Sequence, residues 1–141
     1  MSIDLYSGTP GSGKSLRACY KIIERLKRKK NVIANFAINF DYFKKKSIGQ
    51  FTFKQNENMT VKFLLDYAEK NHEKGREHQT LLVLDECGTM FNSREYAKND
   101  RMKWIVFFQQ HRKLGYDVIL ICQQDRMIDR QIRGFIETEY K

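Results

Sequence analysis

The stretch GTPGSGKSL at residues 8–16 decides the fold of this 141-residue chain. It holds three of the eight glycines and the only proline, residue types used where the backbone turns tightly or approaches a ligand closely. Gly8, four residues, then Gly13, Lys14 and Ser15 reproduce the phosphate-loop pattern G-x-x-x-x-G-K-[ST]. A short apolar run precedes the stretch, and apolar residues at helical spacing follow it. Strand, glycine-rich loop and helix in this order predict a P-loop nucleotide-binding site.

The residues of the loop are expected to bind the phosphates of a nucleotide. Backbone N–H groups of residues 11–15 would converge on the β-phosphate, helped by the positive end of the following helix. Lys14 adds a positive charge against the β- and γ-phosphates, and the Ser15 hydroxyl is the expected Mg²⁺ ligand. The predicted nucleotide-binding residues are Gly8, Thr9, Pro10, Gly11, Ser12, Gly13, Lys14, Ser15 and Leu16.

Polar residues that end the other apolar runs form the second half of the predicted site. In open α/β sheets ligands bind beyond the carboxyl ends of the strands. Asp85, after the run LLVL, is expected to hold Mg²⁺ through water, and Glu86 is placed to polarise an attacking water. Gln123 would be a polar sensor of the γ-phosphate; for Gln124 this role is the weaker alternative, since successive strand residues point opposite ways.

The order of elements predicts one α/β domain over residues 1–141. Strands are expected at 31–40, 51–53, 80–86 and 116–124 and at the C-terminal end, and helices at 60–74, 99–115 and 125–134. Their alternation predicts a mainly parallel sheet between two helical layers, joined by right-handed crossovers. Extra elements between the two motifs, with a glutamate after the metal-binding aspartate, favour the ATPase class that includes RecA-like motors.

Composition limits the setting of the chain. No apolar run reaches the length of a membrane span, and three widely spaced cysteines without a C-x-x-C pair are typical of a reduced cytoplasm. The net charge of +9 is concentrated in basic runs at 27–30 and 44–46. These runs could attract nucleic acid or anionic lipid, or the first could simply complement a helix dipole; the sequence leaves this open.

Four segments together resemble a known family: GTPGSGKS, LLVLDECGTMF, FFQQHRKLGYDVILICQQ and IDRQIRG. Their order and spacing are similar to the N-terminal ATPase domain of the zonular occludens toxin (Zot) family, which is similar to the assembly proteins of filamentous phages. The resemblance covers residues 1 to about 134. The first two segments are generic to many ATPases, whereas HRKLGYD and the C-terminal ICQQ…ID…IR pieces are more specific to the family.

The resemblance implies a RecA-like P-loop ATPase that uses ATP and Mg²⁺ to drive assembly and extrusion of a virion carrying single-stranded DNA. It implies a location on the cytoplasmic face of the host inner membrane. It also implies that this chain is the soluble, cytoplasmic fragment of a longer protein, anchored through a C-terminal segment absent here. Phage assembly and coat proteins, single-stranded DNA and further copies of the chain in a ring-like homo-oligomer are the partners it suggests.

Two other functions stay open at this stage. A small-molecule or nucleotide kinase could use the basic segment 126–133 as an arginine lid, and a nucleotide-gated scaffold would bind ATP with little turnover. Motors of this class often need an arginine from the next subunit; the candidates are Arg94, Arg112, Arg126, Arg130 and Arg133. His111 is expected in the core, and His72 and His78 lack partners at metal-ligand spacing.

Overall fold

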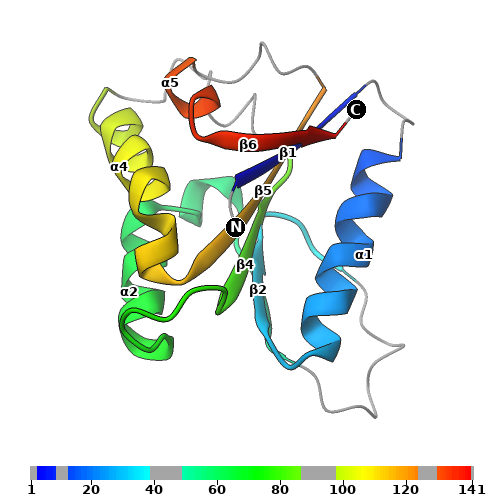
Figure 1. Ribbon diagram of the computed structural model, residues 1–141, viewed down its shortest axis with the longest axis horizontal. Helices are drawn as coiled ribbons and strands as arrows, with labels where there is room; N and C mark the ends of the chain where they lie inside the picture. Colours follow the sequence, from blue (N-terminus) through cyan, green and yellow to red (C-terminus); the bar gives the residue numbers. More distant parts are fainter. Residues whose placement is uncertain (1–2, 9–12, 39–48, 87–97, 124–129, 141) are drawn as a thin grey trace.

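The structure is a computed structural model that describes residues 3–8, 13–38, 49–86, 98–123 and 130–140 (Figure 1). Within these ranges the strands form one sheet in the order β3-β2-β4-β5-β1-β6, and every pair is parallel. The strands are β1 (Ile3–Ser7), β2 (Asn31–Ala34), β3 (Phe51–Phe53), β4 (Thr80–Leu84), β5 (Tyr116–Cys122) and β6 (Ile136–Tyr140). The helices are α1 (Lys14–Lys27), the 3₁₀ turn η2 (Asn56–Asn58), α2 (Val61–Asn71), α4 (Lys98–Leu114) and α5 (Arg130–Arg133).

Helices cover both faces of the sheet, so the predicted three-layer α/β/α arrangement is confirmed. Helix α1 lies on one face, and α2 and α4 lie on the other (Figure 1). Strand residues alternate between two cores: Ile3 and Leu5 of β1 belong to the core beneath α2 and α4, whereas Tyr6 belongs to the core beneath α1. Ile132 of the short α5 joins the first of these cores.

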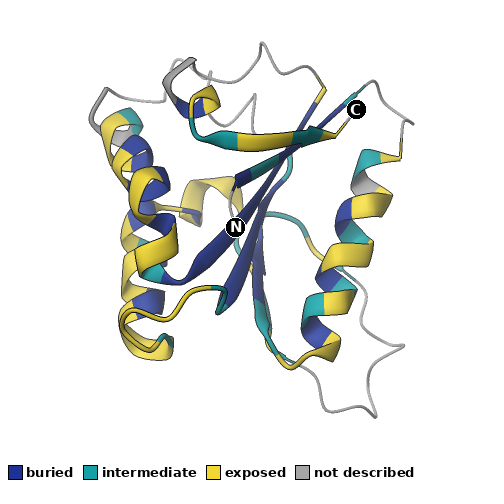
Figure 2. Cartoon of the chain, viewed as in Figure 1, coloured by how far each residue is buried: buried dark blue, intermediate teal, exposed yellow. Residues whose placement is uncertain are grey.

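The two central strands β4 and β5 are buried along their whole length (Figure 2). Because helices pack on both sides, neither face of these strands meets water, and their sequences are nearly continuous apolar runs. Burial of each such Leu, Ile or Val side chain contributes about 1.5–3 kcal/mol. The predicted strands at 80–86 and 116–124 are therefore confirmed, but they end at Leu84 and Cys122, before their polar residues.

The strand predicted at 31–40 is shorter in the structure. It ends at Ala34, and Phe36 and Ile38 pack against the α1 core without continuing the ladder; residues 39 and 40 lie outside the described ranges. The physical reason is Asn35, whose side chain bonds the backbone that follows β4. Apolar alternation alone could not distinguish this packing from a longer strand. The short strand at 51–53 and the C-terminal strand are confirmed.

The helix predicted at 60–74 is shorter in the structure, whereas the helix predicted at 99–115 is confirmed. Thr60 caps α2 by accepting a hydrogen bond from the Phe63 N–H at 3.1 Å, and α2 ends at Asn71, before the Gly75 suggested by the sequence. Helix α4 ends where expected, at Gly115, whose φ of +92° suits glycine. Of the helix predicted at 125–134, the described part contains the turn α5. No helix in the described ranges is long and apolar enough to cross a membrane.

Candidate nucleotide site

The two predicted halves of the site lie at one edge of the sheet. Strands β1 and β4 are both parallel to β5, which lies between them, so their carboxyl ends meet at the same edge. Lys14 begins α1 beyond the end of β1, and Asp85 directly follows β4 (Figure 1). Burial raises the pKa of the Asp85 carboxyl group, and the positive charge of Lys14 acts weakly against it. The chain fold thus brings together residues that are distant in the sequence.

The structure describes both ends of the predicted phosphate loop. Gly13 precedes α1 with a φ of +89°, a left-handed conformation that glycine adopts without strain. The Lys14 Nζ donates a hydrogen bond to the Gly8 carbonyl at 2.8 Å, which holds the ammonium group beside the end of β1. The Gly8 N–H donates to the Gln123 carbonyl at 3.1 Å. The loop is thereby attached to the end of β5 as well as to β1.

Several predicted loop contacts fall outside the described residues. These are the contacts of Thr9, Pro10, Gly11 and Ser12, and those of the Ser15 side chain. Leu16 lies in the first turn of α1 with an exposed side chain. Its predicted contact to the nucleotide would come from its backbone at the positive end of the helix, because the first N–H groups of a helix have no partner within it.

Asp85 and Glu86 adopt an unusual local backbone. The Glu86 N–H donates to the Asp85 Oδ1 at 2.8 Å, and Glu86 has a left-handed φ of +52°. The pKa of Asp85 is raised, and partial burial is the largest cause. The hydrogen bond from the Glu86 N–H lowers the pKa, and the negative charge of Glu86 raises it. The positive charge of Lys14 lowers it by the smallest amount. Asp85 is thus half-buried, with its carboxylate bonded to the next backbone N–H, while the Glu86 side chain is exposed.

Asn35 contacts the candidate site, and the sequence did not single it out. Its Oδ1 accepts a hydrogen bond from the Asp85 N–H at 2.8 Å, and its Nδ2 donates to the Asp85 carbonyl at 2.9 Å. The same Nδ2 lies 2.8 Å from the Asn56 Oδ1 of η2. One amide side chain at the end of β2 therefore fixes the backbone of Asp85 from both sides. A polar residue directly after the buried part of β2 was the available signal, although β4 and β5 separate β2 from the strand that the loop follows.

The remaining predicted residues are only partly placed. The Gln123 side chain is exposed just beyond β5, at the same edge as the loop. Arg112 forms an ion pair with Glu137 of β6, and Arg133 is exposed on α5. Arg94 and Arg126 lie outside the described residues, as does the side chain of Arg130. The contacts of Arg112 and Arg133 do not identify either as the arginine that would complete a neighbouring subunit's site.

The three histidines serve structure. His111 is buried, with its Nδ1 2.7 Å from the Phe108 carbonyl, which confirms its predicted core position. His72 lies between the Leu114 carbonyl and the Thr80 hydroxyl, at 2.6 Å from each. The Leu114 carbonyl can only accept, so Nδ1 is the donor there, and burial lowers the pKa of His72. In the described part of the chain, no group of three or more His, Cys, Asp and Glu side chains could hold a metal ion.

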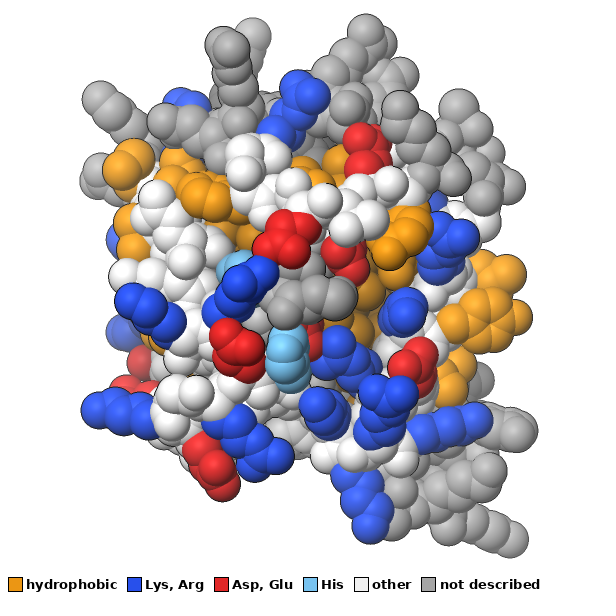
Figure 3. Space-filling view, viewed as in Figure 1, with side chains coloured by type: hydrophobic (Ala, Val, Ile, Leu, Met, Phe, Trp, Pro, Cys, Tyr) orange, Lys and Arg blue, Asp and Glu red, His pale blue; other side chains and the backbone are white. Residues whose placement is uncertain are grey.

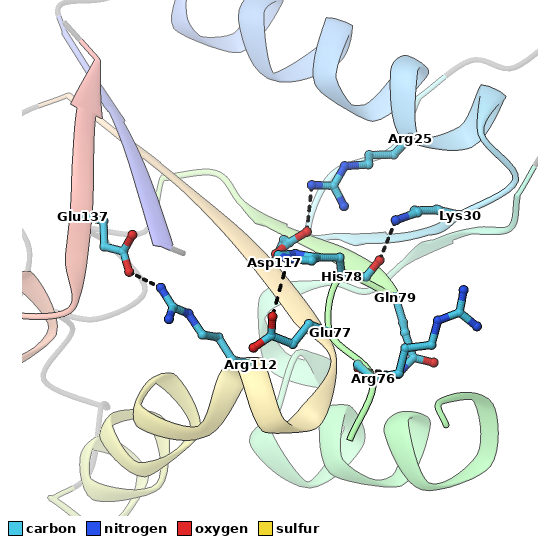
Figure 4. A network of polar contacts seen from close by, with 9 residues as sticks. All are labelled: Arg25, Lys30, Arg76, Glu77, His78, Gln79, Arg112, Asp117 and Glu137. Carbon is cyan, nitrogen blue, oxygen red and sulfur yellow. Dashed lines mark hydrogen bonds and ion pairs between the residues drawn. The ribbon is translucent and has the colours of Figure 1, made fainter. Parts of the chain in front are cut away.

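A network of charged residues lies at the opposite, amino edge of the sheet (Figure 4). The buried Asp117 at the start of β5 is 2.7 Å from the Arg25 guanidinium of α1 and 2.7 Å from the His78 Nδ1. The Lys30 Nζ donates to the His78 carbonyl at 2.9 Å. These contacts attach the end of α1 to the sheet. They lie at the amino ends of the strands, whereas Lys14 and Asp85 lie beyond the carboxyl ends.

Basic side chains gather around the end of α1 (Figure 3). Lys27, Arg28 and Lys29 are exposed there, although Arg28 also pairs with Glu24 at 3.2 Å. These cations can stabilise the negative C-terminal end of the α1 dipole. They can equally contact an anionic partner. The other basic run, at 44–46, is outside the part of the chain that the structure describes.

Known proteins resemble the chain in sequence over almost its full length. The family model described as "Zonular occludens toxin (Zot)" matches residues 2–141. The gene 1 protein of Escherichia phage If1 is 32% identical over 138 residues, which are 94% of this chain and 38% of that protein. The chain therefore spans less than half the length of the curated relatives it matches.

Solved structures resemble the chain in fold. The N-terminal domain of zonular occludens toxin from Neisseria meningitidis gives a TM-score of 0.61 at 19% identity, covering 96% of this chain and 73% of that chain. The genome packaging NTPase B204 from Sulfolobus turreted icosahedral virus 2, solved in complex with ATP-gammaS, gives a TM-score of 0.60 at 17% identity, covering 93% and 68%. The predicted P-loop NTPase fold is thereby confirmed.

Proposed function

Because the chain belongs to the zonular occludens toxin (Zot) family, we propose that it is a Mg²⁺-dependent P-loop ATPase that drives assembly and extrusion of a filamentous phage at the bacterial inner membrane. One observation carries the ATPase part of this proposal: Lys14 and the Asp85-Glu86 pair share the carboxyl edge of one parallel sheet. The binding of ATP-gammaS by B204, which has a similar fold, supports the choice of nucleotide.

The residues at this edge fit Mg-ATP. Among the described residues, an added Cβ at Gly13 would meet nothing within 4 Å, which leaves room for a ligand, and the Lys14 ammonium is held by the Gly8 carbonyl. Carboxylate and hydroxyl oxygens are the ligands that Mg²⁺ prefers. We assign the metal to Ser15 and, through water, Asp85. When bound, the metal neutralises negative charge on the β- and γ-phosphates.

Each residue then has one task in hydrolysis. Lys14 binds the β- and γ-phosphate oxygens and stabilises the charge that develops on them in the transition state. Glu86 accepts a proton from the attacking water, for which its exposed position at the edge is suitable. Gln123 contacts the γ-phosphate from the end of β5 and links it to the loop, because its own backbone carbonyl bonds the Gly8 N–H.

The biological role rests on the family and on the gene 1 relatives, which are longer than this chain. We propose a ring-like homo-oligomer, with an arginine supplied by the neighbouring subunit, working with other phage assembly and coat proteins. Such an arginine is worth about 10³–10⁵ in rate where it has been measured. The exposed cations at the end of α1 would contact single-stranded DNA or the inner-membrane surface.

Product analysis tests the reaction. Purified protein with Mg-ATP and no added acceptor should release inorganic phosphate and ADP in equal amounts. A kinase would instead transfer the phosphate to an acceptor, so ADP formation that requires an added acceptor and yields no free phosphate would replace the hydrolase by the kinase alternative.

Concentration dependence tests the oligomer. If a neighbouring subunit completes the site, turnover per subunit should rise with protein concentration and then reach a plateau. A negligible rate at every concentration, together with intact ATP binding, would support the alternative of a nucleotide-gated scaffold.

Asn35 is expected to position Asp85, and its loss should affect the metal more than the nucleotide. Asn35→Ala removes both hydrogen bonds to the Asp85 backbone. Changes of this kind around a metal ligand typically cost about 10- to 100-fold in metal affinity or activity. We expect the Mg²⁺ concentration for half-maximal hydrolysis to rise and metal-free ADP binding to stay unchanged. The control is Asn58→Ala, at an exposed asparagine of η2; equal effects in both variants would contradict a positioning role.

A further inference from the structure

The direction of the nucleotide along the edge follows from the order of the strands. Asp85 and Glu86 follow β4, and β4 and β5 both lie on one side of β1. A nucleoside triphosphate is a linear molecule whose base and γ-phosphate are at opposite ends. If the γ-phosphate points toward Asp85 and Glu86, the base must leave the loop on the other side of β1. The element on that side is the edge strand β6.

A stack of two rings and a guanidinium lies there. Tyr140 ends β6 in register with Tyr6 of β1, and the two rings meet edge to face with centroids 5.3 Å apart. Arg17 lies on α1, three residues after Lys14, and its guanidinium is over both rings, 5.0 Å from the Tyr140 centroid and 5.9 Å from the Tyr6 centroid. Tyr6 is buried in the core, whereas Tyr140 is 40% exposed.

This stack is built on the nucleotide side of the sheet. Tyr6 belongs to the core beneath α1, so Tyr140, its register partner, is on the same face as the helix that follows the phosphate loop. Strand β6 is the direct neighbour of β1, and neighbouring strands are about 4.8 Å apart. The backbone of Tyr140 therefore lies only one strand spacing from β1. The exposed Arg17 has no ion pair with any described carboxylate, and a planar guanidinium offers the same kind of stacking surface as an aromatic ring.

We propose that Tyr140 and Arg17 form the platform on which the base of the bound nucleotide stacks. This inference rests on the proposed function, because it requires the phosphates to lie in the loop. Stacking of a base on an aromatic side chain uses its π face, which every base has. The platform therefore distinguishes a nucleotide from a bare polyphosphate, and it does not by itself distinguish adenine from guanine.

Binding measurements with and without a base test the proposal. Removal of a stacked aromatic residue typically weakens binding about 5- to 150-fold per base. Tyr140→Leu should weaken ATP and GTP binding roughly tenfold or more and leave inorganic tripolyphosphate binding within about twofold of the wild type. Tyr140→Phe keeps the ring and should restore nucleotide affinity. Arg17→Gln should weaken nucleotide binding in the same selective way.

Phe53 supplies the matched control. It is 44% exposed and ends β3, the strand at the opposite edge of the sheet, so Phe53→Leu should change neither affinity. Unchanged ATP affinity in Tyr140→Leu, or an equal loss of ATP and tripolyphosphate, would overturn the platform while leaving the phosphate loop intact. Absence of both ATP and tripolyphosphate binding in the wild-type protein would instead overturn the proposed function, and the platform with it.

Discussion

Lys14→Ala should abolish ATP binding and turnover. The Lys14 ammonium is held by the Gly8 carbonyl at 2.8 Å, and it supplies a full positive charge that backbone N–H groups cannot replace. Removal of one partner of a desolvated charge pair costs about 2–5 kcal/mol or more, which corresponds to roughly 30-fold to several thousand-fold in affinity. Titration calorimetry with ATP, paired with a phosphate-release assay, measures both effects.

Lys21→Ala is the matched control for this variant. Lys21 lies on the same helix, its side chain is exposed and it pairs only loosely with Glu24, at 4.0 Å. The two substitutions change the net charge equally, so a general electrostatic effect would appear in both. Wild-type ATP affinity in Lys14→Ala would remove the assignment of the phosphate loop.

Glu86→Gln should separate binding from hydrolysis. The substitution preserves size and backbone but removes the carboxylate that accepts a proton from the attacking water. General-base catalysis contributes about 10²–10⁴-fold to a rate, so turnover should fall by about 10² or more while the affinity for ATP stays near that of the wild type. Single-turnover phosphate release and equilibrium binding, measured on the same preparation, provide the two numbers.

The control is Glu69→Gln on α2, which removes an equal charge from an exposed position on the opposite face of the sheet from α1. Its turnover should match the wild type. If Glu86→Gln loses binding and turnover in equal proportion, Glu86 has a structural role in the turn where its φ is +52°, and the general base must be sought elsewhere.

The parts of the fold that the sequence predicts are those with strong local signals. The phosphate-loop pattern between a strand and a helix located Lys14, and the fully buried runs of β4 and β5 identified the central strands. The rule that parallel strands share a carboxyl edge then joined Lys14 to Asp85 without coordinates. All strands of a parallel sheet have their carboxyl ends at the same edge, whatever the order of the strands. The placement of Lys14 and Asp85 at one edge could therefore be predicted without knowing the strand order.

Contacts that depend on side-chain geometry could not be predicted in this way. Asn35 continues an apolar and polar alternation, and only the folded structure shows its amide bonding the Asp85 backbone. The stack of Arg17 on Tyr140 joins residues at opposite ends of the chain, and it follows from the position of β6 beside β1. A polar residue after a buried strand marks Asn35 as a candidate, but no local pattern gives its partner or the partner of Arg17.

A crystal structure of the protein with ATP-gammaS and Mg²⁺ tests the account most directly. We expect the Lys14 Nζ within roughly 2.7–3.2 Å of phosphate oxygens, the Asp85 carboxylate bonded to a water of the metal ion, and the γ-phosphate group on the Asp85 side of β1. A nucleotide bound at the amino edge near Asp117, or one in the loop with its metal ion remote from Asp85, would contradict it.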